Sequence, residues 1–181
     1  MHSTLEDFLP LLGRIANSLE RSPVEEGFAD YAKTIYCNLT KGNGDGWYSL
    51  DDKDATTLPP LFKGRILRIE FPTLKRNGKE VRKLHLLMKA GSRVFKFESG
   101  YDSFFSKTVL AACAVASKEI LSQPIQLATY AKQLNVGGHT LAVSLRDVDG
   151  TQMNCTWSNE DDWRAIAQAA ILNVNEANDR F

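Results

Sequence analysis

From residue 61 to residue 96 the sequence alternates apolar and polar side chains with a period of two, which is typical of half-buried β-strands. In 83–89, for example, Leu84, Leu86 and Met88 fall on one face, and Lys83, His85 and Lys89 fall on the other. Two turn signals divide this stretch, Asn77-Gly78 and the tripeptide at 90–92, and an Asn-Gly pair is typical of tight hairpins. The stretch therefore predicts three successive antiparallel strands, at 61–71, 83–89 and 93–98.

Within the first of these strands the apolar side chains change faces. Ile66 lies on one face of an ideal strand, whereas Leu67 and Ile69 lie on the opposite face. Gly64 precedes this change by two residues. A change of face beside a glycine indicates a β-bulge or strong coiling, so one strand is expected to serve two sides of the fold.

The same stretch carries half of the positive charge in a chain whose formal net charge is zero. Residues 61–96 hold eleven Lys or Arg and two acids, whereas 1–60 hold five and ten and 97–181 hold six and ten. The local field of such a segment persists wherever the acids lie beyond a Debye length, about 8–10 Å at physiological salt. A basic sheet of this kind favours a polyanion as partner, with nucleic acid as the leading hypothesis.

The N-terminal part reads as helical. Apolar residues recur at helical spacing in 3–21, and Ser22 with Pro23 forms a good start for a second helix over 23–39. A short strand at 47–50 and an acidic loop with a Pro-Pro pair follow. We therefore predict a helical N-terminal segment with an acidic loop over 1–58.

The C-terminal half predicts two helices and two more strands. Ser103 is placed to cap a helix that runs to about Leu121, and strands follow at 125–130 and 141–146. The final segment, 158–181, shows helical spacing of its apolar residues after a Ser158–Asp161 cap. We expect this amphipathic helix to pack on the preceding domain, 59–157, and to end in a tail.

The order β-β-β-α-β-β resembles the oligonucleotide/oligosaccharide-binding (OB) fold, loosely of the replication protein A or single-strand-binding type. The segment PIQLATYAKQLNVGGHTLAVSLRDVDG looks like the last two strands of such domains. The resemblance implies an α+β protein with a small five-stranded Greek-key barrel, flanked by the N-terminal helices and the C-terminal helix. It also implies single-stranded DNA or RNA as ligand, bound across the second and third strands between the loops at 72–79 and 132–139.

The basic residues fall where this fold would bind its ligand. The expected contacts come from the outward positions of the strands, from the 72–79 loop, and from one aromatic side chain for base stacking. These residues are Arg68, Lys75, Arg76, Lys79, Lys83, His85, Lys89, Lys96 and Tyr130. Phe95 and Phe97 alternate with charged residues, so we expect them in the core rather than in stacking contact with bases.

The sequence indicates neither an enzyme nor a metalloprotein. The three cysteines are far apart in sequence, and no histidine has a nucleophile or carboxylate at a suggestive local spacing. Asp147 and Asp149 fit a turn better than a metal site. We therefore expect no catalytic residue, no metal and no cofactor. Unpaired cysteines and the lack of a long apolar run predict a cytoplasmic protein without a membrane segment.

Two alternatives remain open at this stage. The domain or its flanking helices could bind a protein partner or a second copy of the chain. Alternatively, the acidic residues of 1–58 could cover the basic strands and regulate access to them.

Overall fold

The computed structural model describes residues 32–39, 46–51, 54–134 and 137–179. The described chain forms nine strands and three helices. In chain order they are β1 (Lys33–Tyr36), β2 (Tyr48–Asp51), β3 (Asp54–Thr57), β4 (Leu61–Glu70), β5 (Thr73–Arg76), β6 (Lys79–Ala90), β7 (Arg93–Gly100), α3 (Phe104–Val115), α4 (Lys118–Leu121), β8 (Ile125–Gln133), β9 (His139–Arg146) and α5 (Trp163–Asn178). The helix expected at 3–21 lies outside the described residues.

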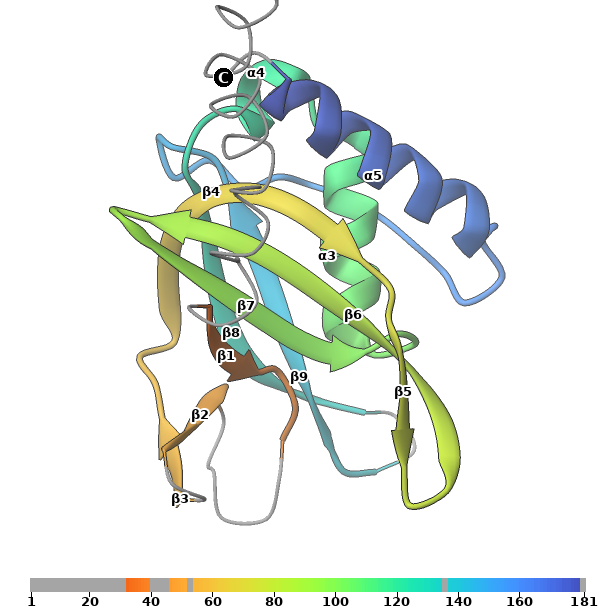
Figure 1. The fold of residues 1–181 in the computed structure, drawn as a ribbon. Helices are drawn as coiled ribbons and strands as arrows, with labels where there is room; N and C mark the ends of the chain where they lie inside the picture. Colours follow the sequence, from red (N-terminus) through yellow and green to blue (C-terminus); the bar gives the residue numbers. More distant parts are fainter. Residues whose placement is uncertain (1–31, 40–45, 52–53, 135–136, 180–181) are drawn as a thin grey trace, which may run out of the picture. The chain divides into compact units, whose positions relative to one another are not determined.

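The strands form one open, mixed sheet in the order β3-β2-β1-β7-β6-β4-β8-β9, with β5 added to β6 (Figure 1). Every pair is antiparallel except β1 with β7. The predicted five-stranded OB-like barrel is therefore wrong, although its five strands all exist as β4, β6, β7, β8 and β9. The edge of β7 is occupied by β1 and is not free to close a barrel, and β9 forms the opposite end of the sheet.

The strands that occupy this edge come from the segment predicted to be helical. Residues 33–36 form β1 rather than the end of a helix, and Ile35 is buried in the core beside its register partner Phe97. The spacing of Ile35 and Leu39 suggested a helix, but long-range pairing with β7 decides the local structure. The short strand expected at 47–50 is confirmed as β2.

The strand β4 pairs with two different neighbours along its length. Residues 61–64 pair with β8, whereas 65–70 pair with β6, and the register shifts between Ile66 and Arg68. The predicted bulge is thus confirmed. Because of the extra residue, Ile66 and Ile69 both face the core although they are three positions apart.

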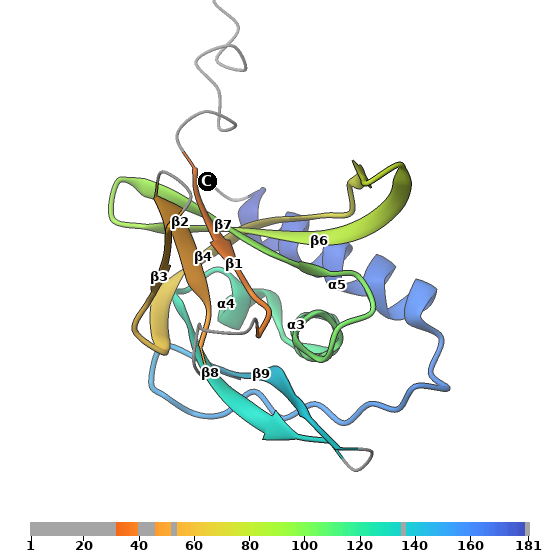
Figure 2. The same cartoon turned by 90° about the horizontal axis from the view of Figure 1, so that it is seen from below.

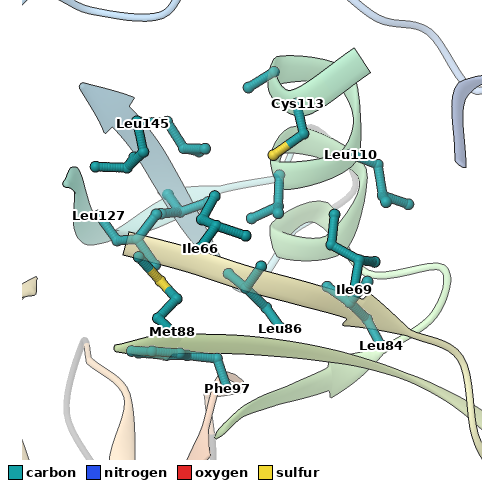
Figure 3. Packing of buried hydrophobic residues seen from close by; sticks show 14 of the residues in the cluster. Ile66, Ile69, Leu84, Leu86, Met88, Phe97, Leu110, Cys113, Leu127 and Leu145 are labelled. Atoms are coloured by element: carbon teal, nitrogen blue, oxygen red, sulfur yellow. The ribbon is translucent and has the colours of Figure 1, made fainter. Parts of the chain in front are cut away.

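The sheet thereby divides into two arms, and α3 fills the space between them. The β4–β6–β7 arm lies on one side of α3 and the β8–β9 arm on the other (Figure 2). Leu84, Leu86 and Met88 of β6 point into the same core as Leu127 and Leu145 of the second arm (Figure 3). None of the described helices is long and apolar enough to span a bilayer.

The helix α5 covers the place where the arms separate. It packs against α3 and β4. Near its end Asn178 donates from Nδ2 to the carbonyl oxygens of Ile66 and Leu67, at 3.0 and 3.1 Å. These carbonyls flank the bulge, where ladder pairing with β6 is interrupted. The side chain therefore gives the carbonyl groups at the bulge additional hydrogen bonds, where the register of the ladder shifts.

The helix ends follow the sequence signals in part. Ser103 caps α3 as predicted, and its Oγ accepts from the backbone N–H of Ser106. The expected helix to Leu121 is interrupted at Ala116 and continues as α4. The final helix is capped by Asp162 instead of Ser158.

We predict that Gly64→Ala destabilises the fold by about 1–3 kcal/mol, because an added Cβ has to push β4 away from β6. A Cβ at Gly64 would lie 2.7 Å from the Lys89 carbonyl oxygen and 2.8 Å from the Phe62 ring. Urea unfolding followed by circular dichroism measures the loss. Gly100→Ala is the matched control, since its Cβ would meet only the Ser103 Cβ, at 3.8 Å. Equal stability of the two variants would contradict the close approach at Gly64.

Candidate nucleic-acid interface

The basic side chains of the sheet gather on the side of the β4–β6–β7 arm that faces away from the core, here called the outer face. In β6 the even-numbered residues from Leu84 to Met88 are buried in the core, so the odd-numbered residues lie on the outer face. Register pairing extends this face to β4 and β7. The charged and titratable residues brought together are Arg65, Arg68, Glu70, Lys79, Lys83, His85, Lys89, Lys96 and Glu98.

Two glutamates neutralise part of this face. Glu98 is buried, with 7% of its surface exposed. Its carboxylate oxygens lie 3.3 Å from His85 Nε2 and 3.9 Å from Lys83 Nζ. Both partners are also largely covered, so Lys83 and His85 contact Glu98 within the sheet and are little exposed to an external ligand. Arg68 is exposed but forms an ion pair with Glu70 at 2.5 Å.

A surplus of positive charge remains on the outer face. It carries six Lys or Arg against two Glu among the described residues. Lys79 and Lys89 are exposed, and Lys96 is partly exposed. The predicted cluster is therefore brought together in space, but the cations available to a ligand are fewer than the sequence suggested.

The segment predicted as a loop at 72–79 forms a two-stranded ribbon instead. Residues 73–76 of β5 pair with 79–82 of β6, an arrangement we call the β5–β6 ribbon. Asn77 and Gly78 both adopt positive φ, 50° and 75°, as the predicted hairpin turn requires. This turn brings the flanking residues into register, so they form a ladder rather than a loop.

The ribbon carries three of the predicted site residues. Lys75 and Lys79 are exposed, on opposite faces of the ribbon by strand alternation. The backbone of Arg76 pairs with Lys79, while its side chain lies outside the described part. The exposed lysines of the ribbon are thus accessible from both of its faces.

A cation–aromatic cluster at the base of the ribbon was missed from the sequence. The guanidinium carbon of Arg82 lies 4.4 Å from the Tyr101 ring centroid and 5.4 Å from that of Phe71. The two rings are 5.3 Å apart and nearly perpendicular. Phe71 and Tyr101 are thirty positions apart, so local pattern gave no sign of the cluster. Such an arrangement offers both a charge and a flat ring to a ligand.

The predicted stacking residue Tyr130 lies in the other arm. It is 48% exposed on β8 and lines a hollow together with Phe104 and Trp157. The structure therefore does not bring Tyr130 into the cluster of the outer face. The expected core placement is confirmed for Phe97, which is fully buried, and Phe95 packs edge-on against Phe62 at 5.0 Å.

The thiols have no features of nucleophiles. Burial, and to a smaller extent the charge of Glu98, raises the pKa of Cys37 well above its usual value. Burial, followed by the nearby Cys155, raises the pKa of Cys113 to about 12, and burial also raises that of Cys155. All three are free cysteines.

Within the described residues no group of three His, Cys, Asp or Glu could hold a metal ion.

We predict that thiol reagents modify the native protein in a fixed order. Cys155 is partly exposed and should react first, whereas Cys37 and Cys113 are buried and should react only after unfolding. Mass spectrometry after timed treatment with iodoacetamide at pH 8 identifies the modified residue. Early labelling of Cys37 or Cys113 in the folded protein would contradict the packing described above.

No protein-family model matches this chain, and no curated protein or solved structure matches it. Inference about function therefore depends on the geometry of the residues themselves. That geometry combines an outer face with surplus positive charge, a ribbon with exposed lysines, and a cation–aromatic cluster at its base.

Proposed function

We propose that the protein binds single-stranded nucleic acid through the outer face and the β5–β6 ribbon. The observation that carries the proposal is the sorting of charge by the sheet. Six Lys or Arg share one face with two Glu. One of the six, Lys79, lies on the ribbon that extends from this face, and Lys75 lies on the other face of the ribbon. A surface of this kind attracts phosphates, and the release of counterions favours binding.

The aromatic groups favour a single strand over a duplex. In a duplex the base faces are stacked on one another and are closed to protein side chains. In a single strand they can stack on aromatic rings or on an arginine plane. The Arg82–Tyr101–Phe71 cluster supplies both kinds of surface on the face of the ribbon that carries Lys75.

Affinity for a single-stranded oligonucleotide should fall steeply with salt. If about four to five phosphates are neutralised, log Kd against log salt has a slope of about 3 in magnitude. Fluorescence anisotropy with single-stranded DNA, single-stranded RNA and duplex DNA measures this at two or more salt concentrations. The proposal expects single strands to bind more tightly than duplex at each concentration.

The double substitution Lys75→Gln with Lys79→Gln should weaken binding and flatten the salt dependence. Two lost phosphate contacts reduce the slope by about 1.4. The control is Lys118→Gln with Arg164→Gln, which removes the same charge from two exposed positions on α4 and α5.

Two results would overturn the proposal. The first is an absence of oligonucleotide binding at about 50 mM salt, where counterion release favours association. The second is equal weakening in the ribbon variant and in the control, which would indicate a general effect of net charge. A complex with an acidic protein, or a second copy of this chain, would then be the better explanation of the outer face.

A further inference from the structure

A hollow of about 170 Å³ opens at the edge of β9, outside the basic surface described above. The N-terminal part of α3 and the segment that follows β9 form its other walls. Tyr130 of β8 and residues of β9 complete its lining. The volume is well below the roughly 300 Å³ at which pockets for drug-sized ligands begin, so it suits one small ring system.

Three aromatic rings give the hollow flat walls. The rings of Phe104 and Trp157 lie 4.8 Å apart, and Trp157 is held by a bond from its Nε1 to Thr108 Oγ1 at 3.3 Å. Trp163 packs edge-on behind Trp157 at 5.5 Å. The Trp157 indole is thus fixed before any ligand arrives, while Tyr130 is exposed at the opening.

The remaining walls are neutral and able to form hydrogen bonds. Gln152 and Asn154 each offer an amide, and Ser144 offers a hydroxyl. None of the described residues lining the hollow carries a formal charge. Flat rings with amide donors and acceptors match the faces and edges of a nucleobase.

A lysine lies over one of the rings that line the hollow. Lys132 Nζ lies 4.1 Å from the Phe104 ring centroid, and no carboxylate of the described residues pairs with it. Lys107, the other lysine near these rings, is instead neutralised by Asp102 at 2.5 Å and also donates to Asn159. Lys132 is therefore the cation available to a phosphate at the mouth of the hollow.

The hollow and the ribbon lie at the same end of the structure. The β5–β6 ribbon and the β8–β9 hairpin both extend in the direction of the N-terminal end of α3 (Figure 1). Seen from that end, they lie on opposite sides of the helix (Figure 2). Phe104 begins α3 and Tyr101 precedes it by three residues, so the two cation–aromatic groups flank one helix end.

We propose that the hollow binds one nucleobase of the bound strand, with Lys132 contacting the adjacent phosphate. The inference rests on the proposed function and adds to it a defined subsite. The base stacks against Tyr130 and the fixed Trp157 indole, while its edge faces Gln152 and Asn154. This subsite gives binding a dependence on bases that a cationic sheet alone cannot supply.

Protection of Cys155 tests occupancy, because this residue lines the hollow. Nucleoside monophosphates at the order of 1–10 mM, typical of weak ligands, should slow iodoacetamide labelling of Cys155 severalfold. Ribose 5-phosphate, which carries the same phosphate without a base, should not. Equal protection by ribose 5-phosphate, or no protection by any nucleotide, would overturn the proposal. Protection by apolar peptides in place of nucleotides would also overturn it.

A second measurement separates this proposal from the general one. Tyr130→Ala should weaken binding of a single-stranded oligonucleotide by about tenfold, the effect of losing one stacked base, and should leave the salt slope unchanged. Leu172→Ala, a truncation of another exposed apolar side chain, is the control and should have no effect. If Tyr130→Ala binds like wild type, the subsite is wrong although strand binding stands. If nucleotides protect Cys155 but no oligonucleotide binds, the subsite stands and the proposed function fails.

Discussion

The divided pairing of β4 is the constraint on which the rest of the structure depends. Its first four residues pair with β8 and its later residues pair with β6, so one strand belongs to both arms of the sheet. The change occurs at Gly64, where the backbone of β6 approaches too closely for any Cβ, and is completed by the bulge at Leu67. An unbent sheet could contact α3 from one side only, whereas here β7 and β9 contact it from two sides. The bend creates the space that α3 fills and the gap that α5 covers. The arrangement of the core therefore depends on the divided pairing of β4.

The packing of β6 against α3 also determines which face of the sheet carries the charged side chains. Once Leu84, Leu86 and Met88 face α3, strand alternation sends Lys83, His85 and Lys89 to the opposite side. Cations crowded on one face repel each other, and Glu98 and Glu70 relieve part of this repulsion. Glu98 is buried beside Lys83 and His85, so these two side chains are largely covered within the sheet and are not available at the surface. The exposed surplus lies farther out, on the ribbon and at the ends of the strands.

Local features of the fold could be predicted from the sequence. The alternation of β6, the Asn77-Gly78 turn, the bulge in β4 and the Ser103 cap each depend on a few consecutive residues, and each is confirmed. The order of the strands could not be predicted, because it depends on which distant edges pair. The β1 segment shows this, since four residues with an ambiguous pattern became a parallel partner of β7 and prevented closure of the expected barrel.

The candidate site shows the same division between local and long-range information. The positions of Lys79 and Lys89 follow from alternation within one strand, whereas the Arg82–Tyr101–Phe71 cluster exists only because β6 pairs with both β4 and β7, whose ends bring Phe71 and Tyr101 to Arg82.

Tyr130 was identified as exposed from its own strand, but its neighbours Phe104 and Trp157 come from the start of α3 and from the segment before α5. Charge density could thus be read along the chain, while ring geometry could not. Because phosphates respond to charge and bases respond to rings, the proposed class of ligand rests on charge that the sequence shows, whereas the proposed base subsite rests on the fold.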